Sequence, residues 1–126
     1  MAEKFPDPPS NWPGSNPEWL VYHALIRLGM KDQFTYQSAK MGGRLSKGGA
    51  VIDFEIPDRN MALNVTSRYY HYATSPLRMA DELQRAALEG RGITVIYLDE
   101  VDLERDAMYY VREALSGRDH SKFGRM

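Results

Sequence analysis

The sequence of 126 residues predicts a single α/β (α+β) domain in which a mixed β-sheet is flanked by helices. Three patterns indicate this fold class. Residues 48–71 alternate apolar and polar side chains around a tight turn, as an antiparallel hairpin does. Residues 92–99, GITVIYLD, are apolar on both faces, which is expected of a strand in the middle of a sheet. Three other segments have the caps and the periodicity of helices.

The first element is an arm that precedes the domain. Residues 1–14, MAEKFPDPPSNWPG, contain four prolines and little periodicity, so we expect them to run extended over a surface or to be disordered. Phe5 and Trp12 are the side chains suited to anchor this arm to a partner.

A helix and a strand follow the arm. The helix is predicted to begin with Ser15 or Asn16 as its cap and Pro17 in its first turn. It should end near Gly29, because glycine suits the left-handed exit from a helix. Residues 33–38, QFTYQS, are predicted to form a strand.

The hairpin has a predicted register. If a four-residue turn over 57–60 joins its strands, Ile56 lies opposite Met61. Counting back then places Asp53 opposite Asn64, and Val51 opposite Thr66. The face expected to be apolar carries Ile52, Phe54, Ile56, Met61, Leu63 and Val65. The other face carries Val51, Asp53, Glu55, Ala62, Asn64 and Thr66.

Two helices and a strand follow the hairpin, so the predicted order along the chain is helix, three strands, helix, strand and helix. A second helix is predicted from about residues 75–76 to Gly90, and a right-handed crossover through it makes the strand at 92–99 parallel to the hairpin. A third helix is expected from about Asp102 to Gly117, and its apolar face would carry Leu103, Ala107, Tyr110 and Ala114. The domain would therefore span residues 15–117, with a basic tail at 118–126.

Composition narrows the classes of function. The chain has no cysteine, which excludes disulfides and thiolate metal sites. No signal peptide and no apolar run of membrane length is evident, so we expect a cytoplasmic or virion-associated protein that is neither secreted nor in a membrane. The segment GGRLSKGG lacks the P-loop pattern, which argues against nucleotide hydrolysis, and we expect no small-molecule substrate.

The charge pattern favours binding of nucleic acid only in one stretch of the chain. The net charge of −1 provides no overall attraction to a polyanion. Lys40, Arg44 and Lys47 nevertheless lie in a glycine-rich stretch without an acid, whereas residues 99–106 are acidic. The basic stretch is either a solvated loop or a set of phosphate contacts.

Polar side chains on the hairpin and one glutamate form the candidate site. Glu18 falls within the apolar stripe of the first helix, where Ser15-Asn16-Pro17-Glu18 fits a capping box. Alternatively, a helix packed on the polar face of the hairpin would bring Glu18 toward Asp53. Metal-dependent phosphodiester cleavage needs a hard cation held by carboxylates, and Asp53 with Glu55 could supply two of them.

The order of elements, with GGAVIDF, ALNVTSRYYH and DELQRAALEGRGITVIYLDEVDL, resembles the PD-(D/E)XK nuclease superfamily, especially its small very-short-patch-repair and phage-type branches. The resemblance covers about residues 15–115 and implies a restriction-endonuclease-like α-β-β-β-α-β-α core. It also implies a magnesium site made by an acid on the first helix, an aspartate and an E-x-K motif. By position these correspond to Glu18, Asp53 and the segment 64–66, and His71 resembles a histidine that follows the same strand.

Asn64 and Thr66 stand where that motif has an acid and a lysine. We therefore favour a nuclease-fold module with a decayed magnesium site, acting as a nucleic-acid-associated binding or structural component of a phage, virion or DNA-processing assembly. The basic residues expected to contact DNA are Lys40, Arg44, Lys47 and Arg68. The alternative is an active Mg²⁺-dependent endonuclease that uses Glu18, Asp53 and Glu55 together with Asn64, Thr66 and His71. A protein-binding domain without nucleic acid is a third possibility.

Overall fold

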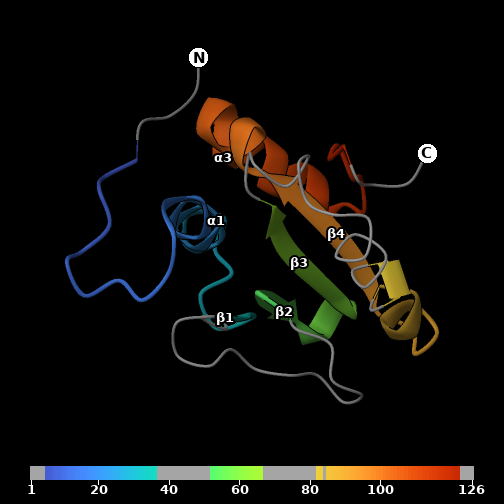
Figure 1. The fold of residues 1–126 in the computed structure, drawn as a ribbon. Coiled ribbons are helices and arrows are strands. Elements are labelled where there is room, and N and C mark those ends of the chain that lie inside the picture. The colour runs from blue at the N-terminus through green and yellow to red at the C-terminus, as the bar shows by residue number, and fades with distance from the viewer. Residues whose placement is uncertain (1–4, 37–51, 67–81, 84, 123–126) are drawn as a thin grey trace.

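A four-stranded mixed sheet with helices packed against it forms the core of the computed structural model (Figure 1). The structure describes residues 5–36, 52–66, 82–83 and 85–122. Its elements are α1 (Asn16–Arg27), β1 (Thr35–Tyr36), β2 (Phe54–Ile56), the 3-10 helix η2 (Pro57–Arg59), β3 (Met61–Thr66), β4 (Thr94–Asp99) and α3 (Glu100–Leu115). Residues 82–83 and 85–89 are also helical. The predicted mixed sheet flanked by helices is confirmed.

The sheet has the order β1-β2-β3-β4, with antiparallel pairs up to β3 and a parallel pair of β3 and β4. The predicted hairpin register is confirmed, because Ile56 pairs with Met61. The predicted four-residue turn is also present: η2 is followed by Asn60, which has the left-handed angles φ 48° and ψ 52°. Asparagine tolerates this conformation better than most residues, so the turn closes without a glycine.

Two apolar clusters lie on opposite faces of the sheet. The larger one joins α1 and α3 to the side of the sheet that carries Phe54, Ile56 and Leu63. The smaller one comprises Ile52, Ala62, Leu88, Val95 and Tyr97. The prediction that Ile52 shares a face with Phe54 is wrong. The reason is that β2 begins only at Phe54 and Asp53 forms a bend, so the two-residue alternation of a strand does not extend back to Ile52.

Helix α1 packs on the apolar face of the hairpin, and the alternative of a helix on the polar face is not what the structure shows. Val21, Ala24 and Leu25 of α1 are fully buried in the same cluster as Phe54. An apolar helix stripe gains free energy only against apolar partners, and this outweighs any attraction toward the polar face. The helix ends as predicted, since Gly29 has φ +80°.

Strand β4 is the last strand of the described sheet, whereas a central position was predicted. Its residues from Val95 to Leu98 are nevertheless all buried, because α3 and α1 cover one face and the helical segment containing Leu88 covers the other. A strand covered on both faces has the same apolar pattern at the end of a sheet as in its middle, which explains the error.

Helix α3 begins two residues earlier than predicted and is divided at Asp106, whose angles are non-helical. The Asp106 carboxylate accepts a hydrogen bond from the Tyr109 amide (3.1 Å) and so caps the second half of the helix. Of the predicted core positions on α3, Tyr110 is only partly buried, and Val111 is fully buried in its place. The helix ends before Gly117, which has φ +88°, as predicted.

Both ends of the described chain lie against the domain. Arm residues from Phe5 onward run along α1, and the indole of Trp19 donates a hydrogen bond to the Pro6 carbonyl (2.8 Å). Phe5 and Trp12, expected to reach a partner, contact α1 of the same chain. Tail residues 118–122 contact α3 and β4. Within the described ranges, no helix is long and apolar enough to cross a bilayer.

Candidate functional site

Asp53 and Asn64 lie opposite each other where the β2–β3 pairing ends. The Asp53 amide donates to Asn64 Oδ1 (2.9 Å), and the Val65 amide donates to Asp53 Oδ2 (2.9 Å). Phe54 is the first residue of β2, and backbone pairing with β3 stops there. The two side-chain bonds continue the pairing one residue further. The polar pair therefore holds the two chains together beyond the bend, where backbone pairing has stopped.

The carboxyl group of Asp53 is perturbed electrostatically. Burial, the largest effect, raises its pKa from 3.8 to about 6, and the hydrogen bond from the Val65 amide opposes this rise. Repulsion from Glu18 raises the pKa further. Proximity of Glu18 to Asp53 is the expectation for a helix on the polar face, and α1 packs instead on the apolar face, so only this charge effect connects the two acids.

Glu18 also completes the predicted capping box. Its Oε1 accepts hydrogen bonds from the Ser15 amide (2.8 Å) and from the Ser15 hydroxyl (2.9 Å), and the Glu18 amide donates back to that hydroxyl (3.3 Å). One oxygen of the helix acid is therefore engaged at the start of α1. Of the two interpretations of Glu18, the structure shows the capping box.

Thr66 does not join this pair. Its side chain is only 5 % exposed, and its hydroxyl donates to the Asp99 carboxylate (2.5 Å). Thr66 and Asp99 are register partners at the carboxyl ends of the parallel strands β3 and β4. The other oxygen of Asp99 accepts a hydrogen bond from the Lys122 amide (2.9 Å). The structure thus pairs Thr66 with a residue on a different strand.

Asp99 is a partner of Thr66 that the sequence patterns did not predict. A signal was available, because Asp99 is the polar residue that ends an apolar strand, and side chains at the carboxyl ends of neighbouring parallel strands gather at one edge. The missing information was which residue of β3 lies beside it, and this depends on the register of the parallel pair.

The described residues do not by themselves assemble a set of magnesium ligands. Within these ranges, no three side chains of His, Asp or Glu come together in a group that could hold a metal ion. Glu55 lies opposite Ala62, one step closer to the turn than Asp53, as expected. Oxygens of Asp53, Asn64 and Glu18 already accept hydrogen bonds from the protein. A hard cation takes six or more oxygen ligands, so these residues would supply only part of its coordination shell.

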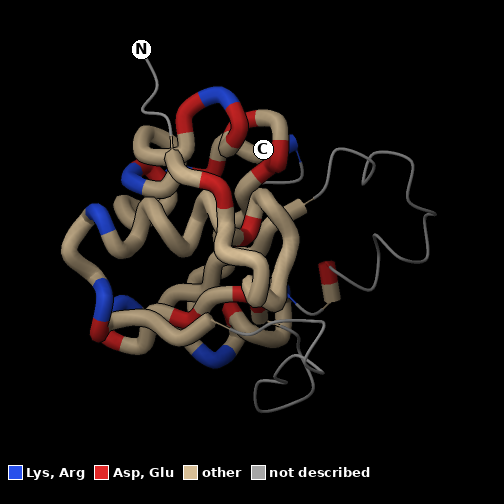
Figure 2. The backbone as a smooth tube through the Cα atoms, turned by 90° about the vertical axis from the view of Figure 1, so that its left-hand side faces the viewer, with Lys and Arg blue, Asp and Glu red and all other residues tan. Residues whose placement is uncertain are grey.

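Several predicted residues fall outside the described ranges: His71, Lys40, Arg44, Lys47 and Arg68. Their roles stay predictions. Within the part of the chain that the structure describes, basic and acidic residues are interspersed along the backbone (Figure 2).

No family model, no curated protein and no solved structure significantly matches this chain.

Proposed function

We propose that this chain is a restriction-endonuclease-like module whose polar residues at the expected catalytic positions serve the fold, and which acts as a nucleic-acid-associated binding or structural component of a larger assembly. The observation that carries the proposal is the reciprocal bonding of Asp53 and Asn64 to backbone amides. These bonds use the Asp53 and Asn64 side chains to extend the strand pairing beyond Phe54, which is a structural role.

The environment of Thr66 supports the same function. In the superfamily that the sequence resembles, this position carries a lysine. Here the side chain is buried and bonded to Asp99, so it cannot orient a water molecule on the side of Asp53 without breaking that bond. The basic stretch around Lys40, Arg44 and Lys47 supports nucleic acid as the partner.

One observation favours a second candidate, an active Mg²⁺-dependent endonuclease. The charge of Glu18 contributes to the raised pKa of Asp53, which supports a role for both acids at one cation. In this function both carboxylates would bind the cation, with Glu18 using the oxygen that the capping box leaves unused.

A nicking assay separates the two candidates. Purified protein is incubated with supercoiled plasmid and Mg²⁺ or Mn²⁺, beside Asp53→Ala and a commercial nicking enzyme as positive control. The proposal predicts equal retention of supercoiled DNA by the wild type and the variant. Metal-dependent nicking that Asp53→Ala abolishes would establish the endonuclease instead.

Salt dependence tests the nucleic-acid part of the proposal. Affinity for duplex DNA should fall steeply with salt, and Lys40→Ala/Arg44→Ala/Lys47→Ala should lower the slope of log K against log salt by up to about 3. The matched control, Lys31→Ala/Arg91→Ala/Arg112→Ala, removes three exposed charges elsewhere and should leave the slope nearly unchanged. If salt does not weaken the affinity, the nucleic-acid part of the proposal is wrong and the interpretation as a protein-binding domain stands.

A further inference from the structure

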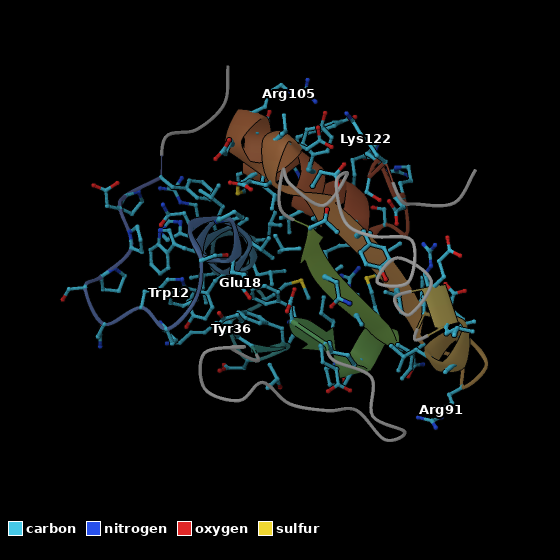
Figure 3. All side chains as sticks on the ribbon, in the orientation of Figure 1. Trp12, Glu18, Tyr36, Arg91, Arg105 and Lys122 are labelled. Atoms are coloured by element: carbon cyan, nitrogen blue, oxygen red, sulfur yellow. The ribbon has the colours of Figure 1, made fainter. Side chains whose placement is uncertain are left out.

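The proline-rich arm covers an aromatic surface, which we define as Trp19, Tyr22, His23 and Tyr36. The first three residues are half-buried on α1, and Tyr36 belongs to β1. The ring of Trp19 stacks parallel to that of Tyr22 with a centroid distance of 5.9 Å. Trp12 of the arm lies beside Tyr36 where the arm passes α1 (Figure 3).

One end of the arm is held by Phe5 and Pro6. The ring of Phe5 lies 4.7 Å from that of His23, and the Arg27 guanidinium sits over it at 5.1 Å. The Trp19 indole donates its hydrogen bond to the Pro6 carbonyl. The ring contact of Phe5 and the hydrogen bond to the Pro6 carbonyl therefore hold neighbouring residues of the arm.

The other end is held by Trp12. Its ring stacks on Tyr36 with a centroid distance of 4.9 Å and an interplanar angle of 15°. It also makes edge contacts with Trp19 and Tyr22, both at 5.1 Å. Two aromatic anchors, seven positions apart, thus seat the segment that contains Pro6, Pro8 and Pro9.

This combination is the general chemistry by which folded domains bind proline-rich peptides. In such domains an indole N–H bonds to a carbonyl of the peptide, as Trp19 does to Pro6, while here the ring contacts come from Phe5 and Trp12 of the arm. Proline also fixes φ, so an extended segment loses little conformational entropy on docking. The arm has the properties of a peptide ligand that is covalently attached to its own binding site.

The attachment is short. Gly14 joins the arm to Ser15, the cap of α1, and a methyl group on Gly14 would overlap the Tyr36 hydroxyl. A rotation of the backbone near Gly14 is sufficient to redirect the whole arm. If the arm of a second copy took its place, every contact described above would be conserved, which is the condition for exchange of an element between identical chains.

We propose that the aromatic surface is a docking site for the proline-rich arm, and that where copies of this chain are held close together it takes the arm of a second copy in place of its own. This inference goes beyond the proposed function and does not depend on a nuclease ancestry. A short tether gives the chain's own arm an effective concentration in the millimolar range. Exchange therefore becomes important at a comparable local concentration of copies, as inside an assembly.

The absence of cysteine from the chain allows a direct test with full-length protein. Phe5→Cys in one copy and His23→Cys in another place a thiol on each side of the arm contact, where the two rings are neighbours. The two single variants are mixed near millimolar concentration with a short bis-maleimide, which joins two thiols without the strict geometry of a disulfide. We expect a cross-linked heterodimer, identified by mass, in at least tenfold excess over the control mixture of Phe5→Cys with Arg91→Cys.

Arg91 is a suitable control because it is exposed and lies far from the arm (Figure 3). The double variant Phe5→Cys/His23→Cys at micromolar concentration should instead be cross-linked within one chain by the same bis-maleimide, which shows that the arm still docks. Equal cross-linking in the test and control mixtures would overturn the proposal. Failure of the double variant to form its intrachain cross-link would also overturn it, because the arm would then not occupy the aromatic surface.

Discussion

At the scale of single residues, Asp53 has a structural role that the alternating strand pattern did not predict. Its carboxylate accepts the Val65 amide, and its own amide donates to Asn64, so both partners extend the hairpin beyond its backbone pairing. This role is costly because the charged group is largely removed from water.

Asp53→Asn tests this cost. The folded chain holds the Asp53 proton more tightly than the unfolded chain, because the pKa rises from 3.8 to about 6. Stability from this group is therefore fully present below pH 3.8 and is lost as the pH rises through about 6, by about 3 kcal/mol at most. Asparagine keeps an oxygen for the Val65 amide and does not titrate. Urea unfolding between pH 4 and 8 should show the pH dependence reduced in Asp53→Asn and retained in Asp58→Asn, whose side chain is exposed.

Gly14→Ala tests the close approach of the arm to β1. The added methyl group would overlap the Tyr36 hydroxyl, so we expect a loss of about 1–3 kcal/mol in the free energy of unfolding. Removing that hydroxyl with Tyr36→Phe in the same chain should recover part of the loss. Thermal unfolding of both single variants and the double variant measures the coupling, and strictly additive losses would contradict a direct contact.

At the scale of elements, the tail segment 118–122 seals the outer edge of β4. The Tyr97 amide donates to the Asp119 carboxylate (3.0 Å), and the Lys122 amide donates to Asp99. Glu113 of α3 anchors the segment through Arg118 and His120. The Arg118 guanidinium, followed by His120, lowers the pKa of Glu113 to about 2. A strand edge covered in this way is protected from pairing with other chains.

Glu113→Gln should loosen this segment without unfolding the domain. The variant loses the charge that holds Arg118 and His120, so the Tyr97 and Lys122 amides should exchange with deuterium faster while amides within the β3–β4 pair keep their protection. Hydrogen-exchange mass spectrometry or NMR measures this difference. Glu82→Gln, an exposed acid on another helical segment, is the control, and unchanged exchange at Tyr97 would count against the anchoring role.

At the scale of the whole molecule, contacts distant in sequence join the hairpin to the last helix. The Arg59 guanidinium donates to the Leu115 carbonyl (3.1 Å), across 56 residues, and so satisfies an acceptor at the end of α3. The larger apolar cluster draws on α1, β2, β3, β4 and α3 together. Such a core predicts that the domain unfolds in a single cooperative transition.

Arg59→Ala should therefore lower the free energy of the global transition by about 0.5–1.5 kcal/mol, because a hydrogen bond to a helix end is lost. The loss should be the same by fluorescence of Trp12 and Trp19 and by far-ultraviolet circular dichroism. Lysine at this position keeps the charge but lacks the planar guanidinium, so Arg59→Lys should recover only part of the loss. Two separate transitions in wild type would argue against one cooperative core.

Local chemistry in the sequence was sufficient to predict the caps, the turn and the hairpin register. Ser15 with Glu18, Gly29, Gly117 and the turn before Met61 each depend on neighbours within a few residues, and each was predicted correctly. The mixed sheet followed from the apolar patterns of the strands and the crossover between them.

Tertiary structure alone decided the rest, because it depends on which distant surfaces meet. The bend at Asp53 sends Ile52 to the opposite face, the register of the parallel pair joins Thr66 to Asp99, and α1 packs on the apolar face of the hairpin. Each outcome depends on a balance between burial and hydrogen bonding over the entire domain. The residues involved are far apart in the sequence, so no short segment contains the information.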